Sequence, residues 1–336
     1  MRRPGAPSSI VGVEQATVRR RCVPAGRGRR SWGAGERTPG LVVGSPLPRL
    51  ALPWLVLPGL ALPAAAQGGA PRVAQVHRAD APEGRLLSFY SAATLFTSSG
   101  ATAQRARWSV GVEATVIPAL SEAQRRPGID KPETTNLSPV LPRPRAALRV
   151  GATVVEGSWI PPVAVGDARA TLGALAIAHR VGRWHDVAFL PRLSLVTGRV
   201  RGAITCNAAT ARTGGADLAT YYAAVCHGRD SDDWFEPRLV AGEVVAQRAG
   251  RDGAATWWLA VGARRDRSRF DIGVQHPDGT RDRDHPVLVL EDTRLHLTGG
   301  VRWPLGARLV TAAEAFFAPG SMLTVRTLLA LTPRAR

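Results

Sequence analysis

The segment Arg107–Pro118, "RWSVGVEATVIP", decides the fold class because apolar and polar residues alternate along it. Val110, Val112 and Val116 fall on one face of an extended chain, and Glu113 falls on the opposite face. Side chains of a β-strand point alternately to its two faces, so this pattern predicts a strand with one apolar and one polar face.

The same period of two recurs along the chain and predicts an all-β fold. The segments are longer than the usual strand of about 5–6 residues in soluble proteins and are long enough to cross a membrane at a tilt. Their even number is typical of bacterial single-chain barrels, so we expect a single antiparallel up-and-down transmembrane β-barrel of about ten strands (about 8–12). The segment 86–97, "LLSFYSAATLFT", is also compatible with a helix. The predicted strands are 86–97, 107–118, 146–159, 168–181, 187–204, 236–248, 255–270, 292–304, 307–317 and 321–332.

Charged residues lie in the middle of the polar faces, where a crowded lumen would hold them. Arg–Glu pairs could fill and close a narrow barrel, or the excess of Arg could form a weakly anion-selective passage, and ten strands enclose little space, which favours the closed interior. The residues predicted to face the lumen are Glu113, Arg149, Arg169, Arg192, Glu243, Arg264, Arg294, Arg302, Arg308, Glu314 and Arg326.

Connections between the predicted strands sort into short turns and long polar loops. Counting back from the C-terminus places 249–254 and 304–307 at one end, and 274–287 at the other with the segment between Cys206 and Cys226. On this count, the long segment 121–144 falls at the end that holds the short turns. Either it folds into the lumen or the periplasm, or one strand before it is miscounted.

The full chain has 336 residues and a net charge of +18. Its N-terminal part predicts export. Residues 1–46 are an Arg-rich extension, either disordered or upstream of the true start. Residues 47–66 have the three parts of a signal peptide, with cleavage between Ala66 and Gln67. A linker, 67–85, and the barrel domain, 86–335, follow. Export argues against nucleic acid as a partner, despite the positive charge.

Cysteine usage agrees with an exported protein. Cys206 and Cys226 bracket a polar loop and predict a disulfide, with two free thiols as the alternative. No Cys/His spacing suggests a zinc site, and we expect neither a metal nor a cofactor.

Taken together, the signal, the alternating strands, the tight turns and the long loops resemble the small bacterial outer-membrane β-barrel proteins over roughly 80–335. The resemblance implies an outer-membrane location, contact with lipid and lipopolysaccharide, and insertion by the barrel assembly machinery. The chain departs from such proteins at its end, "LLALTPRAR", which lacks a terminal aromatic residue. We expect a structural or binding role, or narrow passage of small solutes, including anions. A secreted soluble β-sandwich that binds a ligand is the alternative.

A barrel hydrolase is the third hypothesis, and we expect that the protein is not an enzyme. Ten-stranded barrels include the omptin proteases, and "DSDDW" (230–234) and "RDRDHP" (281–286) offer Asp and His in predicted loops. Asp284 and His285 are adjacent, however, so a strand would point them to opposite faces, and solvated loop charges explain both segments. No G-x-S-x-G motif is present. The remaining candidates are Ser88, Ser158, Ser194, Ser268, Ser321, His179 and His296.

Overall fold

The computed structural model describes residues 73–100, 106–126, 133, 139–165, 168–250, 255–282 and 284–333. The chain divides into two compact units, 1–66 and 67–336, and every described residue belongs to the second. The predictions for the extension 1–46 and for the signal peptide 47–66 with its cleavage at Ala66 therefore lie outside the described residues.

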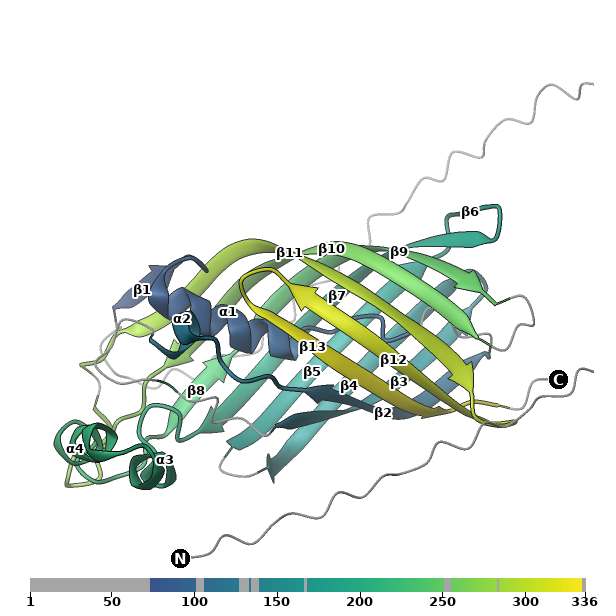
Figure 1. The fold of residues 1–336 in the computed structure, drawn as a ribbon. Coiled ribbons are helices and arrows are strands. Elements are labelled where there is room, and N and C mark those ends of the chain that lie inside the picture. The colour runs from purple at the N-terminus through teal and green to yellow at the C-terminus, as the bar shows by residue number, and fades with distance from the viewer. Residues whose placement is uncertain are drawn as a thin grey trace, which may run out of the picture. The chain divides into compact units, whose positions relative to one another are not determined.

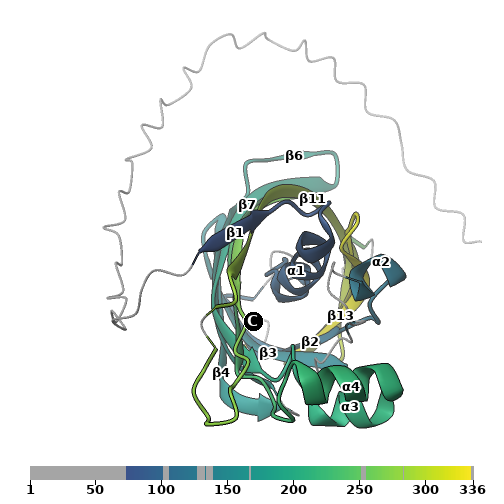
Figure 2. The same cartoon turned by 90° about the vertical axis from the view of Figure 1, so that its left-hand side faces the viewer.

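Ten strands close into an antiparallel barrel, as predicted (Figures 1 and 2). Each pairs with the next along the chain, and the last pairs with the first from Arg326↔Thr115 to Leu331↔Val110. Closure gives every strand of the barrel two paired neighbours, which satisfies backbone groups that lipid cannot hydrogen-bond. The strands are β2 (Trp108–Val116), β3 (Val140–Val150), β4 (Thr153–Val165), β5 (Ala168–His179), β7 (Val187–Gly202), β9 (Arg238–Ala249), β10 (Thr256–Asp271), β11 (Val287–Pro304), β12 (Leu309–Ala318) and β13 (Met322–Leu331).

Three short strands and three short helices lie outside this ring. β1 (Ala74–His77) runs parallel to the start of β11, β6 (Gly182–Trp184) pairs with β7, and β8 (Asp233–Glu236) lies between β7 and β10. The helices α2 (Glu122–Arg125), α3 (Ala208–Thr213) and α4 (Ala216–Ala224) lie at the same end of the barrel as β1 (Figure 1). We call this the loop end, and the opposite end the turn end.

The predicted first strand, 86–97, is wrong. Its residues belong to helix α1 (Pro82–Thr94) and the extended segment after it, and Figure 2 shows α1 inside the ring of strands. Every residue from Leu86 to Thr94 is buried. A helix surrounded by protein needs no polar stripe, so its sequence lacks the period that normally marks a helix.

The predicted strand 146–159 is also wrong, because it is two strands joined by a tight turn. β3 ends at Val150 and β4 begins at Thr153, and Gly151 has a positive φ of 60°. The gain of this strand offsets the loss of 86–97, so the number ten stands. The shift in count also moves the connection after β2, whose described part 117–126 contains α2, from the turn end to the loop end, where the other long loops lie.

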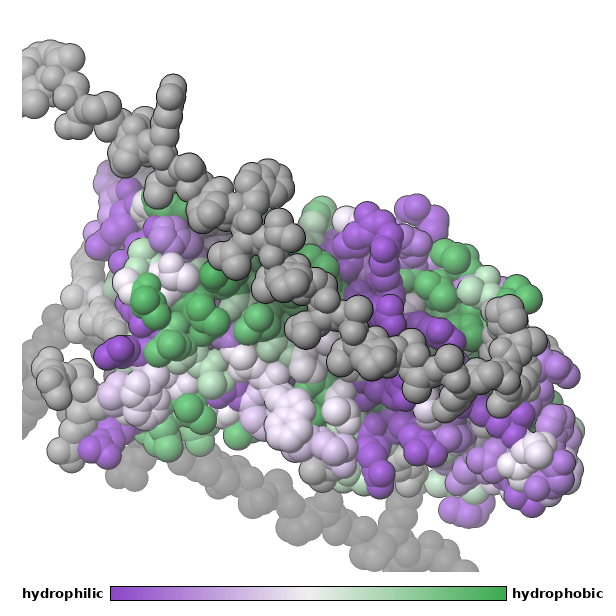
Figure 3. Space-filling model, turned by 180° about the vertical axis from the view of Figure 1, so that it is seen from behind, coloured by the Kyte–Doolittle hydropathy of each residue, from purple (hydrophilic) through white to green (hydrophobic). Residues whose placement is uncertain are grey.

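The two faces of the barrel wall differ as the alternation predicts. Val112 and Leu295 on the outer face are 50% and 64% exposed, whereas Glu113 and Arg264 on the inner face are fully buried. Figure 3 shows hydrophobic surface over the wall and hydrophilic surface gathered toward the loop end. Apolar residues therefore point outward over much of the wall, and the soluble β-sandwich alternative is wrong.

Candidate functional site: the filled lumen

The chain passes through its own barrel from the loop end to the turn end. β1 pairs with the first residues of β11, and α1 follows it into the lumen. At the turn end, just before β2, the Arg107 carbonyl accepts a hydrogen bond from the backbone N–H of Arg149 at 2.7 Å. We call residues 82–100 the plug.

A chain of buried ion pairs crosses the inner wall beside the plug. Arg145 contacts both Glu113 and Glu156. Arg192 contacts Glu156 at 3.0 Å and Glu243 at 2.9 Å. His296 extends the chain, with its Nε2 2.9 Å from Glu243. Each shared carboxylate thus lies between two basic side chains, and all of these side chains are buried.

The wall arginines also donate hydrogen bonds to backbone carbonyls of the plug. Arg143 donates to Thr94 O at 2.7 Å, Arg192 to Phe96 O at 2.9 Å, and Arg326 to Leu95 O at 2.8 Å. The last carbonyls of a helix lack partners within the helix, and cations near its C-terminus are favourable. The last turn of α1 has no basic residue of its own, so the wall supplies that charge.

Cation–π contacts and a hydrogen bond to a carboxylate complete the junction between plug and wall. The Phe96 ring lies under the guanidinium groups of Arg145, at 4.2 Å, and Arg192, at 5.3 Å. Such cation–π contacts add to the hydrogen bonds when the groups are desolvated. Glu314 accepts a hydrogen bond from the Ser99 backbone N–H at 2.9 Å. Side chains of β3, β7, β12 and β13 therefore hold the plug.

Close packing fills the lumen toward the turn end. Trp258 is 4% exposed, and its ring lies against Gly100 and Gly300. A Cβ atom at Gly100 would approach the ring to 2.9 Å, and one at Gly300 to 2.4 Å, so glycine is required at both positions. Arg302 donates to the Gly100 carbonyl at 3.0 Å beside this contact. Side chains thus occupy the space in which an open channel would run.

The residues predicted to face the lumen fall into three groups in the structure. Arg149 is half-buried at the turn end, and Arg294 is partly buried and donates to Pro319 O at 2.6 Å. The prediction is wrong for Arg169, which is exposed on the outer face, and for Arg308, which is exposed in the turn between β11 and β12. The buried inward-facing residues are Glu113, Arg192, Glu243, Arg264, Arg302, Glu314 and Arg326.

Sequence reasoning missed three central members of the network. Arg143, Arg145 and Glu156 are 2%, 5% and 0% exposed. Glu156 was missed because the turn at Gly151 restarts the alternation, which moves even-numbered residues of β4 to the inner face. A Gly followed by a restarted alternation is the signal that could have found it.

An arginine belt covers the outer wall near the loop end. Arg169 lies opposite Arg201 in the β5–β7 ladder, and Arg267 lies opposite Glu291 in the β10–β11 ladder. Arg199 lies 3.8 Å above the Trp234 ring. The acids near the belt are Asp232, Glu236, Asp271 and Glu291. The belt consists of Arg169, Arg199, Arg201, Arg238, Arg265, Arg267 and Arg269.

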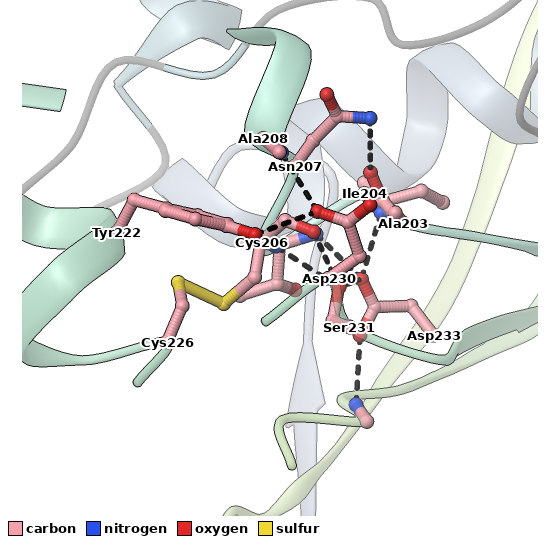
Figure 4. The surroundings of a disulfide bond; sticks show 12 residues. Ala203, Ile204, Cys206, Asn207, Ala208, Tyr222, Cys226, Asp230, Ser231 and Asp233 are labelled. Carbon is pink, nitrogen blue, oxygen red and sulfur yellow. Dashed lines mark hydrogen bonds between the residues drawn. A yellow bond between two sulfur atoms is a disulfide. The ribbon is translucent and has the colours of Figure 1, made fainter. Parts of the chain in front are cut away.

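The long loop between β7 and β8 is cross-linked and anchored. Cys206 and Cys226 form the predicted disulfide, with a Cα–Cα distance of 5.7 Å (Figure 4). Asp233 accepts hydrogen bonds from the Ile204 N–H at 2.9 Å and the Ser231 hydroxyl at 2.7 Å. Partial burial raises the pKa of Asp232, but the hydrogen bonds and charge of Arg201 outweigh it, so that pKa is lowered. The loop therefore presents a fixed surface.

The candidate catalytic residues are dispersed. His285 contacts Asp282 at 3.2 Å, and the Asp284 backbone N–H donates to the same carboxylate at 2.8 Å. His179 bonds to Thr153 at 2.9 Å, and His296 contacts Glu243. Within the described residues, the hydrogen bonds of these histidines therefore go to residues other than the candidate serines. The serines Ser88, Ser268 and Ser321 bond to other serines, to Arg264 or to Asp266.

The described part of the chain contains no group of three His, Cys, Asp or Glu side chains placed to hold a metal ion. None of its helices has both the length and the hydropathy to cross a membrane.

Comparison with solved structures finds outer-membrane proteins at low similarity. A loop-deleted OmpT of Vibrio cholerae is 9% identical, with a TM-score of 0.24 over 57% of this chain and 53% of that chain. Ail of Yersinia pestis, solved with a heparin analogue, is 10% identical, with a TM-score of 0.28 over 67% and 95%. The Pseudomonas putida toluene transporter TodX is 10% identical, with a TM-score of 0.27 over 74% and 76%. This chain thus spans about half the length of the Vibrio structure. No protein-family model and no curated protein matches the sequence.

The geometry of the chain itself assigns its class. A closed antiparallel barrel with an apolar outer wall and a charged interior matches the physical requirements of a protein that crosses a bilayer with strands. Long loops gather at one end and short turns at the other, as in barrels of the bacterial outer membrane. The chain therefore has the fold of a transmembrane β-barrel with ten strands.

Proposed function

We propose that the protein is a closed outer-membrane barrel with a structural or binding role, whose lumen is filled by its own N-terminal plug. The observation that carries the proposal is the set of hydrogen bonds from wall arginines to plug carbonyls, represented by Arg143, Arg192 and Arg326. Arginines bonded to carbonyls and to wall glutamates are not free to attract a passing anion. These contacts favour the closed interior over the anion passage.

Current recordings in planar lipid bilayers test this proposal. Because the plug and Trp258 occupy the lumen, the purified full chain is expected to give no stepwise currents at any voltage. A control preparation of a known open porin, reconstituted in the same way, must give steps. Reproducible voltage-independent steps from the folded chain would contradict the closed barrel and favour passage of small solutes.

We also propose that the arginine belt binds the phosphate groups of lipopolysaccharide. With the loop end outward, as is usual for these barrels, the belt lies on the membrane-facing wall beside the outer leaflet. Arginine pairs well with phosphate because its guanidinium presents several donors in a fixed plane. The seven arginines exceed the four nearby acids, which leaves positive charge for a lipid anion. Insertion by the barrel assembly machinery is a further expectation of this placement.

Replacing three belt arginines should weaken this lipid binding. For the variant Arg169→Gln/Arg238→Gln/Arg265→Gln, we expect roughly tenfold or greater loss of lipopolysaccharide affinity, since each basic residue near an anionic lipid surface contributes about 1 kcal/mol. Native mass spectrometry of the barrel with added lipopolysaccharide measures the effect. The matched control, Arg183→Gln/Arg248→Gln/Arg308→Gln, removes three exposed arginines at the turn end. Equal retention of lipopolysaccharide by both variants would contradict the proposal.

A further inference from the structure

The barrel wall divides at the loop end, between β3 and β4. Their ladder runs from Val150↔Thr153 only as far as Arg145↔Ser158. From there toward the loop end, residues 140–144 of β3 stay paired with β2, and residues 159–165 of β4 stay paired with β5. Two stretches of described strand therefore face each other without forming a ladder.

Prolines stand where the missing ladder would need donors. The Arg149 N–H points toward β2, since it donates to the Arg107 carbonyl. Backbone N–H groups alternate in direction along a strand, so those of even-numbered residues in β3 point toward β4. Pro142 and Pro144 are such residues, and neither has an N–H. The split thus exposes fewer unpaired donors to the membrane than an ordinary strand edge would.

A cavity of about 380 Å³ lies at this split. Its lining combines the lipid-facing residues Val112, Pro142 and Pro144 with buried residues such as Leu172 and Phe235. It therefore reaches from the outer face of the wall into the barrel, between the wall and α1.

The chemistry of the cavity selects an apolar occupant. Among the described residues that line it, none is charged, and only Tyr90 and Thr94 have a polar side chain. A dry apolar cavity of about 150 Å³ can hold benzene, so this cavity has more than twice the volume needed for one aromatic ring. The Tyr90 hydroxyl is buried and lacks a hydrogen-bond partner among the described residues, so it is a polar group that a ligand could engage.

We propose that this cavity is a binding site for a small hydrocarbon-like molecule, which enters from the lipid between β3 and β4. An apolar solute is concentrated in the hydrocarbon layer, and the split opens on the side of the wall that faces that layer. Entry through the lumen would instead require passage across the filled interior beside Arg145 and Arg192. The site is separate from the ion-pair network and from the arginine belt, so it does not depend on either proposed role above.

Naphthalene binding to the full chain in lipid nanodiscs tests the site. After the signal of protein-free nanodiscs is subtracted, we expect saturable binding to one site. Ala170→Phe and, as a second variant, Ala168→Phe place a ring inside the cavity and should each weaken binding by tenfold or more. The matched control, Leu175→Phe, adds a ring on the lipid-facing side of the same strand and should leave binding unchanged. Equal binding to folded Ala170→Phe, Ala168→Phe and Leu175→Phe, or no saturable binding at all, would overturn the site.

A cross-link across the split tests the route. Continuing the β3–β4 register beyond Arg145↔Ser158 places Pro144 opposite Trp159, so the variant Pro144→Cys/Trp159→Cys can be oxidised to join the strands. We expect the oxidised form to bind naphthalene at least tenfold more slowly than the reduced form. The two single variants, treated with the same oxidant and reductant, control for effects on Cys206–Cys226. An unchanged rate in the cross-linked form would overturn entry from the lipid.

Discussion

Replacing Glu156 with glutamine is expected to lower the free energy of unfolding by about 3–5 kcal/mol, the usual cost of removing one partner from a buried ion pair. Glu156 is fully buried and accepts hydrogen bonds from both Arg145 and Arg192. Glutamine keeps the shape of the side chain but removes its charge and places an NH₂ group toward a guanidinium. Two buried arginines would then share one negative charge fewer, in surroundings where water cannot replace it.

Urea unfolding in detergent or lipid vesicles, followed by tryptophan fluorescence, measures this effect. The matched control is Glu236→Gln, which removes a partner of the exposed Arg199 at the belt. Exposed pairs contribute only about 0–1 kcal/mol, so the control should change stability little. If Glu156→Gln and Glu236→Gln had equal effects, the interior of the barrel would have to be hydrated rather than packed.

The sequence predicted the wall of the barrel better than its contents. Alternation such as that around Val110 and Val112 depends only on local geometry, and it survives wherever one face meets lipid. It failed at Arg169, because near the loop end the outer wall is charged on β5, β7, β9 and β10 while Ala170 and Leu172 face the interior. On β2 and β3 the outer wall stays apolar at this end, as the exposed Val116 and Val140 show. The rule that apolar residues point outward holds only over the hydrocarbon layer.

The position of the plug inside the barrel could not be predicted from its own residues, although a helix was an alternative for 86–97. Leu86, Phe89 and Tyr90 are buried by strands that lie far along the chain, so no local period marks them. The burial of Ser88, for example, depends on Arg264 and Ser321, more than 170 residues away. The predicted inward arginines outnumber the inward glutamates because several of them bond to carbonyls of the plug instead.

The β3–β4 split also could not be predicted from the sequence of its own strands. Pro142 and Pro144 are visible in the sequence, yet a proline is tolerated in an edge strand as well as at a gap. Only the register of β3 with both of its neighbours reveals that the prolines face an unpaired strand. Which hydrogen-bonding edge of a strand lacks a partner is a property of the closed barrel and not of the segment.

The central claim, that α1 lies inside the barrel, is tested most directly by a cross-link between plug and wall. The Ser88 and Ser321 hydroxyl oxygens are 2.6 Å apart, on α1 and at the start of β13. Two cysteines there would be close enough for a disulfide, which requires neighbouring Cβ atoms. Ser91→Cys/Ser268→Cys is a second pair, with hydroxyl oxygens 2.9 Å apart. The control, Ser88→Cys/Leu323→Cys, replaces an exposed residue on the outer face of β13.

Mobility of the boiled protein on a non-reducing gel reports the bond, because joining residues 233 positions apart makes the denatured chain more compact. We predict near-complete cross-linking of Ser88→Cys/Ser321→Cys in the folded barrel, loss of the shift on reduction, and none in the control. Free, reagent-accessible thiols at both positions of the folded double variant would contradict the account, because α1 would then lie outside the lumen.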